Sequence, residues 1–94
     1  MRVRVRIIPL SEKGVCAVRK EYEQGKKKLK LGLIKVFLEG DGLVVETTRR
    51  FDLVLRSDVL KKAFVEDLKS KIIRSLEEEG CVLESDYTYK IIEG

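Results

Sequence analysis

Hydrophobic and charged residues alternate without interruption over residues 2–7, RVRVRI. Strict alternation is the period of a β-strand, in which successive side chains point to opposite faces of a sheet. The segment therefore predicts a strand with two valines and an isoleucine on one face and Arg2, Arg4 and Arg6 on the other. Neighbouring like charges are unfavourable unless anions face them, so this strand needs a partner. That partner is either nucleic-acid phosphate or acidic side chains of the same chain.

The period changes after Pro9, the only proline, which ends the first strand. Ser11 is a candidate N-cap, and Gly25 is the expected end of a helix between them. The apolar stripe of this helix is Val15, Val18 and Tyr22. The alternative is a strand over residues 15–20, VCAVRK, because Gly14 and the valines weaken a helix.

Residues 29–56 contain two apolar runs that flank the tripeptide GDG. Asp41-Gly42 is typical of a type I′ hairpin turn, in which both central residues have positive φ. With that turn, the predicted cross-strand pairs are Leu38 with Val45, Val36 with Thr47 and Ile34 with Arg49. The buried face of the second strand is then expected to continue through Phe51, Leu53 and Leu55.

The longest helical pattern follows, over residues 58–79, with Ser57 as its expected N-cap and Gly80 as its end. Its apolar stripe is Leu60, Ala63, Phe64, Leu68, Ile72 and Leu76. Residues 81–92 predict a last strand, with Leu83, Tyr87, Tyr89 and Ile91 on its inner face.

The predicted order of elements is β-α-β-β-α-β, which resembles the split βαβ arrangement of ferredoxin-like folds over essentially the whole chain. The resemblance concerns the fold alone. It implies a four-stranded antiparallel α+β sheet of order 4-1-3-2 with two helices on one face. If residues 14–20 are a strand, the expectation is a five-stranded antiparallel sheet with one long helix. Either way, the 94 residues make one domain, residues 1–94.

In the 4-1-3-2 order the first strand lies between the fourth and the third. The three arginines would then lie on the same face as four carboxylates of neighbouring strands, Glu84, Asp86, Glu46 and Asp52. We therefore expect an internally neutralised ladder rather than a row of phosphate contacts.

The composition favours a particular habitat. Charged residues make up 38% of the chain, histidine and asparagine are absent, and Gln24 is the only glutamine. Depletion of thermolabile amides with enrichment in charge is typical of hyperthermophiles, so we expect an archaeal or archaeal-virus origin. No apolar run reaches membrane-spanning length and the N-terminus lacks a signal-peptide pattern, which predicts a cytoplasmic protein. Disulfides occur inside such cells, so Cys16 and Cys81, which the layout brings near each other, are candidates for a disulfide.

The residue inventory excludes most catalytic chemistry. Without histidine there is no Ser-His-Asp or Cys-His arrangement, and two cysteines do not make a structural zinc site. No phosphate-binding glycine loop is present. Acylphosphatase-type enzymes of similar size need an asparagine, and metallochaperones need C-x-x-C; both are absent. We therefore expect a non-catalytic protein with no cofactor and no metal.

Residues 1–35 carry eleven Lys/Arg against three Glu, whereas residues 36–94 carry nine against thirteen Asp/Glu. The densest cations follow one another closely: Arg19, Lys20, Lys26, Lys27, Lys28 and Lys30. Such a cluster predicts salt-sensitive contact with a DNA or RNA backbone. Base-specific readout is not expected, because Phe51 falls on the core face and no exposed aromatic pair lies on the central strands. The alternative is a homodimer or complex subunit that associates through the open sheet face and has no nucleic-acid role.

Overall fold

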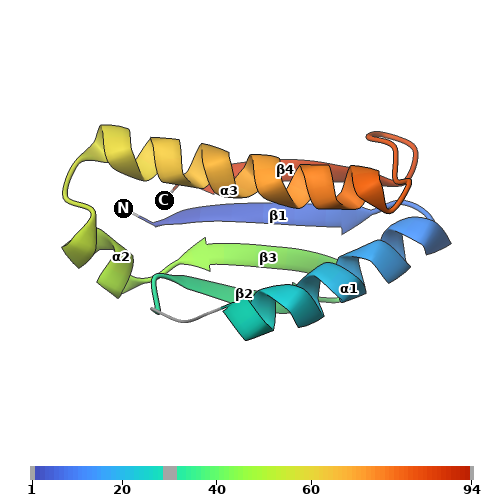
Figure 1. The fold of residues 1–94 in the computed structure, drawn as a ribbon, viewed down its shortest axis with the longest axis horizontal. Coiled ribbons are helices and arrows are strands. Elements are labelled where there is room, and N and C mark those ends of the chain that lie inside the picture. Colours follow the sequence, from blue (N-terminus) through green and yellow to red (C-terminus); the bar gives the residue numbers. More distant parts are fainter. Residues whose placement is uncertain (1, 29–31, 94) are drawn as a thin grey trace.

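The computed structural model describes residues 2–28 and 32–93, and of residues 26–28 it describes the backbone alone. The elements are β1 (Val3–Pro9), α1 (Glu12–Lys28), β2 (Ile34–Glu39), β3 (Gly42–Thr47), α2 (Arg49–Val54), α3 (Asp58–Glu78) and β4 (Tyr87–Glu93). The four strands form one antiparallel sheet in the order β2-β3-β1-β4, which read from the other edge is 4-1-3-2. Helices α1 and α3 lie on one face of this sheet, and α2 lies at its end (Figure 1). The chain is thus an α+β fold with three helices in the described residues, one more than expected.

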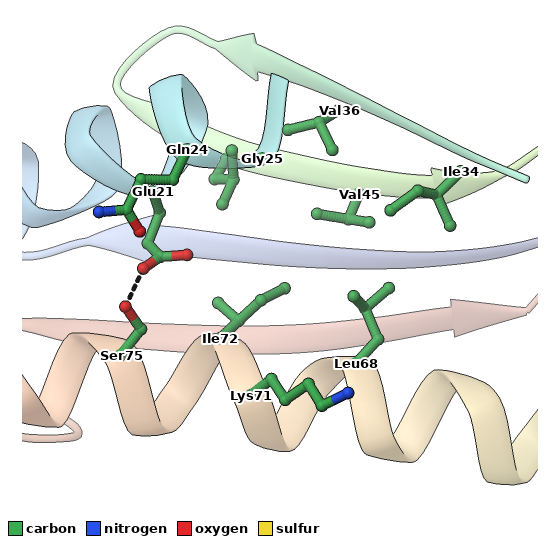
Figure 2. Close-up of a pocket in the computed structure, with 11 residues that line it drawn as sticks. Glu21, Gln24, Gly25, Ile34, Val36, Val45, Leu68, Lys71, Ile72 and Ser75 are labelled. Atoms are coloured by element: carbon green, nitrogen blue, oxygen red, sulfur yellow. Dashed lines mark hydrogen bonds between the residues drawn. The ribbon is translucent and has the colours of Figure 1, made fainter. Parts of the chain in front are cut away.

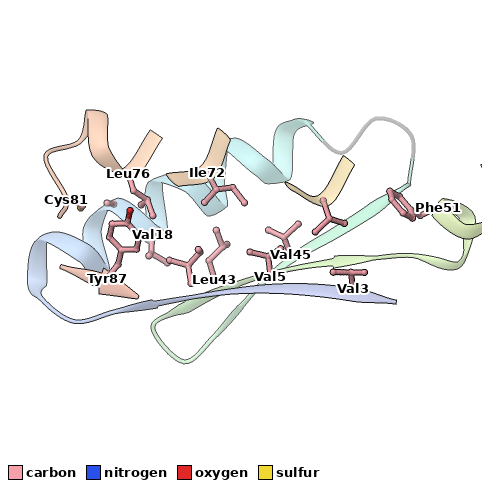
Figure 3. Close-up of a cluster of buried hydrophobic side chains, with 13 residues drawn as sticks. Val3, Val5, Val18, Leu43, Val45, Phe51, Ile72, Leu76, Cys81 and Tyr87 are labelled. Atoms are coloured by element: carbon pink, nitrogen blue, oxygen red, sulfur yellow. The ribbon is translucent and has the colours of Figure 1, made fainter. Parts of the chain in front are cut away.

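The alternation of β1 positions the core. Val3, Val5 and Ile7 are buried against the helices, as the sequence pattern predicts (Figure 3). The core cluster of buried residues is Val3, Val5, Ile7, Ala17, Val18, Leu43, Val45, Phe51, Val65, Ile72, Leu76, Cys81 and Tyr87. Because side chains of β1 and β3 alternate, the same strands present their other residues on the open face.

The hairpin between β2 and β3 turns one residue earlier than predicted. Glu39 pairs with Gly42, so the two-residue loop is Gly40-Asp41 and not Asp41-Gly42. The observed pairs are Leu38 with Leu43, Val36 with Val45 and Ile34 with Thr47. Gly40 has φ +63° whereas Asp41 has no positive φ, a pattern of type II′ rather than type I′ turns. The shift moves each pairing by two residues, so the predicted faces are unchanged.

The second strand of the hairpin is shorter than predicted. It ends at Thr47, and the residues that follow form α2. The reason is that β1 begins at Val3, whose N–H donates to the Thr47 hydroxyl at 2.9 Å, so the ladder has no further partner. Phe51 is still buried as expected, with its ring 5.0 Å from that of Phe64, but Leu53 is 71% exposed.

Helix α1 confirms the helical interpretation of residues 11–25 over the strand alternative. The Ser11 hydroxyl accepts a hydrogen bond from the Gly14 N–H at 3.1 Å, which is the expected N-cap. The helix does not stop at Gly25 but continues to Lys28. A Cβ at Gly25 would be 3.5 Å from Val36, so this glycine lies where the helix packs on β2.

Helix α3 ends as predicted. Gly80 has φ +86°, and its N–H donates to the Glu77 carbonyl while the Cys81 N–H donates to that of Leu76. These two bonds make a Schellman motif. At the other end Ser57 occupies the N-cap position, but its side chain makes no capping hydrogen bond.

The predicted apolar stripe of α3 is wrong at its beginning. Leu60 and Ala63 are exposed, whereas Val65, which the stripe omitted, is buried. A helix of 21 residues is about 31 Å long and a strand of seven about 23 Å, so the first turn of α3 extends past the sheet.

The last strand begins later than predicted. Residues 81–86 form a loop in which Glu84 has φ +71°, and β4 starts at Tyr87. Tyr87 is fully buried as expected, while Leu83, outside the strand, is 42% exposed.

Candidate nucleic-acid interface

Arg2, just before β1, and Arg4 and Arg6 of β1 lie close to acidic side chains on the same sheet face. Arg4 donates to Glu46 through Nε and Nη2 at 3.2 and 3.0 Å, and Arg2 Nη1 lies 3.8 Å from the same carboxylate. Arg6 Nη2 reaches across β3 to Glu39 at 3.1 Å. Exposed pairs of this kind contribute little stability, but they leave no row of free arginines for phosphates.

Two of the expected partners lie outside this ladder. Glu84 and Asp86 precede β4 and lie in the loop, where the Asp86 carboxylate accepts from the Ser11 hydroxyl and the Val82 N–H at 2.7 and 2.8 Å. These two bonds lower the pKa of Asp86. Asp52 lies on α2, and its Oδ1 is 2.9 Å from Lys61 Nζ. Of the four expected acids, Glu46 is therefore a direct partner of the arginines. Lys61 lowers the pKa of Asp52, and Asp52 also interacts with Arg2 through its charge, which helps to lower this pKa.

Two of the predicted nucleic-acid contacts already face acids. Lys20 Nζ is 2.7 Å from Glu79 Oε1, and this hydrogen bond raises the pKa of Lys20. Arg19 Nη2 is 3.9 Å from Asp41 Oδ1, with both side chains largely exposed. Neither residue lies beside the end of α1.

The lysines of the predicted cluster lie at and beyond that end. Lys26, Lys27 and Lys28 are the last residues of α1, and their side chains are outside the described part of the chain. Lys30 lies wholly outside the described residues.

Further cations gather close to where the described chain resumes. The Arg50 side chain lies over Gly32: a Cβ built on Gly32 would be 3.7 Å from Arg50 Cδ and Nη1. The N–H of Thr48, just before α2, donates to the Leu33 carbonyl at 3.0 Å, which holds α2 beside the start of β2 (Figure 1). We define the basic end as residues 49–62, which comprise α2, the link to α3 and the first turn of α3. Its exposed cations are Arg49, Arg50, Arg56 and Lys62, against one exposed acid, Asp58.

The sequence interpretation missed Arg49 and Arg50 because it placed them on alternate faces of a strand. On α2 both are exposed at the same end of the molecule. The double arginine after a threonine pair was the available signal, but the end of β3 at Thr47 depends on the contact of Thr47 with Val3 of β1.

A small apolar cleft separates α1 from α3 above the hairpin strands (Figure 2). Its volume is about 180 Å³, below that of sites for drug-sized ligands. The apolar lining is Ile34, Val36, Leu43, Val45, Leu68 and Ile72. Its polar rim is already engaged, since Ser75 donates to Glu21 and Lys71 Nζ lies 2.9 Å from Asp67. This arrangement offers apolar contact and no acid–base pair.

Both cysteines are free thiols, so the disulfide considered between Cys16 and Cys81 is not formed in the structure. Cys16 is exposed on α1, whereas Cys81 is buried with its Sγ 3.9 Å from the Lys13 carbonyl oxygen. Burial raises the pKa of the Cys81 thiol, which makes it a poor nucleophile.

Among the described residues, no three side chains of the metal-binding types are grouped as a metal ion would require. None of the helices in that part of the chain is long and apolar enough to cross a bilayer. Searches of protein-family models, of curated proteins and of solved structures give no match to this chain.

Proposed function

We propose that the protein is a non-catalytic nucleic-acid-binding protein that contacts the phosphate backbone with its basic end. The observation that supports this is the position of Arg50 over Gly32, two residues after Lys30 in the sequence. The Arg49-Arg50 pair is thereby held beside the start of the chain segment that follows the lysines in the sequence. Phosphate contacts need clustered cations without acidic partners, and the arginines of β1 do not offer that.

We also propose that the fold is a ferredoxin-like βαββαβ domain with α2 inserted between the third strand and the second long helix. The strand order and the antiparallel pairing support this. The insertion matters for the proposed function because it carries Arg49 and Arg50.

The test is fluorescence anisotropy with a labelled duplex and a labelled single strand, each at several salt concentrations from about 50 to 300 mM. Affinity should fall linearly on a log–log plot, with a slope of about −0.9 per phosphate contact on duplex DNA. We expect Arg49→Glu with Arg50→Glu to weaken binding at least tenfold at low salt. The slope should become less steep by about 2.

The matched control is Arg74→Glu with Lys90→Glu, which changes the net charge equally at two exposed positions on α3 and β4. It should weaken binding much less. Equal losses of affinity in the two variants would mean that only the net charge of the protein matters. If the wild type does not bind at 50 mM salt, or binds with an affinity that does not change with salt, the proposal is refuted.

Neutralising Lys26, Lys27, Lys28 and Lys30 to glutamine tests the other half of the proposed surface. We expect a loss similar to that of the arginine variant. Replacing Arg19 and Lys20 with glutamine should have a smaller effect, because both already face acids.

A further inference from the structure

Exposed apolar side chains lie at both ends of the molecule. At the basic end they are Leu53, Val54, Val59 and Leu60, with exposures of 71, 59, 76 and 56%. At the opposite end, where α3 finishes, they are Leu10, Val82 and Leu83, with exposures of 50, 59 and 42%. The longest axis is 39 Å. The elements that carry these residues lie near its two extremes, with α2 and the start of α3 at one end and the end of β1 and the loop before β4 at the other (Figure 1). Large apolar side chains gathered in this way are typical of contact surfaces.

The charges around the two apolar groups have opposite signs. The cations of the basic end were defined above. We define the acidic end as the start of α1, the last turn of α3 and residues 80–86. Four of its exposed acids form no ion pair with another described residue: Glu12, Glu77, Glu78 and Glu84. The cations close by are engaged, since Lys13 donates to the Gly80 carbonyl and Lys20 to Glu79.

Most of the acidic run at the end of α3 works against the stability of that helix. Glu77, Glu78 and Glu79 lie at the negative end of the helix dipole, where carboxylates are unfavourable. Of the three, Glu79 has a cationic partner, Lys20, at 2.7 Å. A local arrangement that works against stability often serves an interaction.

We propose that copies of this protein associate head to tail, with the basic end of one copy against the acidic end of the next. Apolar groups meet at the centre of such a contact and opposite charges surround them. Two basic ends, or two acidic ends, would repel each other, so the contact is heterologous and each copy keeps one end free for another. The occupant of both apolar surfaces is therefore a second copy of this chain.

The size of the contact predicts its strength. The two shorter dimensions are 23 and 22 Å, so an end-on contact covers roughly 500 Å² on each partner. That is at the low end for specific interfaces, so we expect association in the micromolar range, weakened by salt.

The test is sedimentation velocity of nuclease-treated protein from about 5 to 500 µM, at 50 and 500 mM NaCl. The wild type should sediment faster as its concentration rises at low salt, and this increase should be lost at high salt. Two charge-reversal variants are compared with the wild type: Arg56→Glu with Lys62→Glu, and Glu77→Lys with Glu78→Lys. Among the exposed charges named above, the first variant leaves the basic end without a net positive charge, and the second leaves the acidic end without a net negative charge.

Each variant alone should self-associate more weakly than the wild type, with a Kd for self-association at least tenfold higher. An equimolar mixture of the two variants should associate again. Glu77→Lys with Glu78→Lys should also raise the melting temperature, because it places cations at the helix C-terminus. A raised melting temperature excludes misfolding as the cause of lost association. The control Arg74→Glu with Lys90→Glu should associate like the wild type.

A strictly monomeric wild type at 500 µM and low salt would overturn the proposal. So would undiminished association of either variant alone, or a mixture that stays monomeric. Because sedimentation is measured on nuclease-treated protein with no nucleic acid added, the outcome is separate from that of the nucleic-acid titration.

Discussion

Gly14 decides how closely α1 approaches the loop before β4. A Cβ at this position would lie 2.0 Å from the Asp86 carbonyl oxygen, a distance at which one group has to move. That carbonyl accepts from the Leu10 N–H at 2.8 Å. Gly14→Ala therefore requires a displacement of at least about 1 Å, enough to break this main-chain hydrogen bond.

The local and tertiary effects of this substitution have opposite signs. Alanine in place of glycine inside a helix is favourable by about 0.5–1 kcal/mol. Forcing a group into a filled site costs about 1–3 kcal/mol, and the lost hydrogen bond costs about 1 kcal/mol more. We therefore expect Gly14→Ala to lower the free energy of unfolding by about 1–3 kcal/mol, or to lower the melting temperature by roughly 5–20 °C for a domain of this size.

Urea unfolding followed by far-UV circular dichroism measures the change. Gly25→Ala is the matched control in the same helix, because its Cβ would meet Val36 at 3.5 Å, an ordinary contact. It should raise the free energy of unfolding by about 0.5–1 kcal/mol. If Gly14→Ala is as stable as the wild type or more stable, the close approach to Asp86 is not what requires glycine there.

Two further predictions concern buried and hydrogen-bonded groups. The Tyr87 side chain is fully buried, and its hydroxyl has no hydrogen-bond partner among the described residues. Tyr87→Phe should therefore raise the free energy of unfolding, measured in urea, by about 1–3 kcal/mol. A loss of stability would show that the hydroxyl forms a hydrogen bond. The hydrogen bonds from Ser11 and Val82 lower the pKa of Asp86, so its contribution is present above the ordinary value of 3.8 and is lost as the pH falls through the lower folded value. The difference in urea midpoint between the wild type and Asp86→Asn should accordingly be largest near pH 7 and shrink below about pH 4, and a difference that does not change with pH would contradict this.

Local chemistry explains most of what the sequence predicted correctly. The alternation of residues 2–7 placed Val3, Val5 and Ile7 in the core, Ser11 was identified as an N-cap, and Gly80 as the end of α3. In each case the signal and its structural effect lie within a few residues. The faces of the hairpin were predicted despite the wrong turn, because a shift of two residues preserves them.

The misplaced elements depended on contacts between distant residues. The pattern after Thr47 suits a strand or a helix. Because β1 begins at Val3, β3 has no β1 residue to pair with beyond Thr47, and the helix α2 forms instead. The exposure of Leu60 likewise follows from the length of α3 relative to the sheet. Neither length comparison can be made from one segment alone.

For the candidate surfaces, too, some features could be recognised in the sequence and others only in the tertiary structure. The lysines at residues 26–30 were visible as a cluster in the sequence, but only the tertiary structure places Arg50 beside Gly32, two residues after Lys30 in the sequence. The sequence by itself determined the periods, the caps and the catalytic chemistry excluded by the absence of histidine. Tertiary structure decided which charges pair, because a pair such as Arg6 with Glu39 forms across an intervening strand. It also decided which apolar residues stay exposed, because burial of a side chain depends on the elements packed over it.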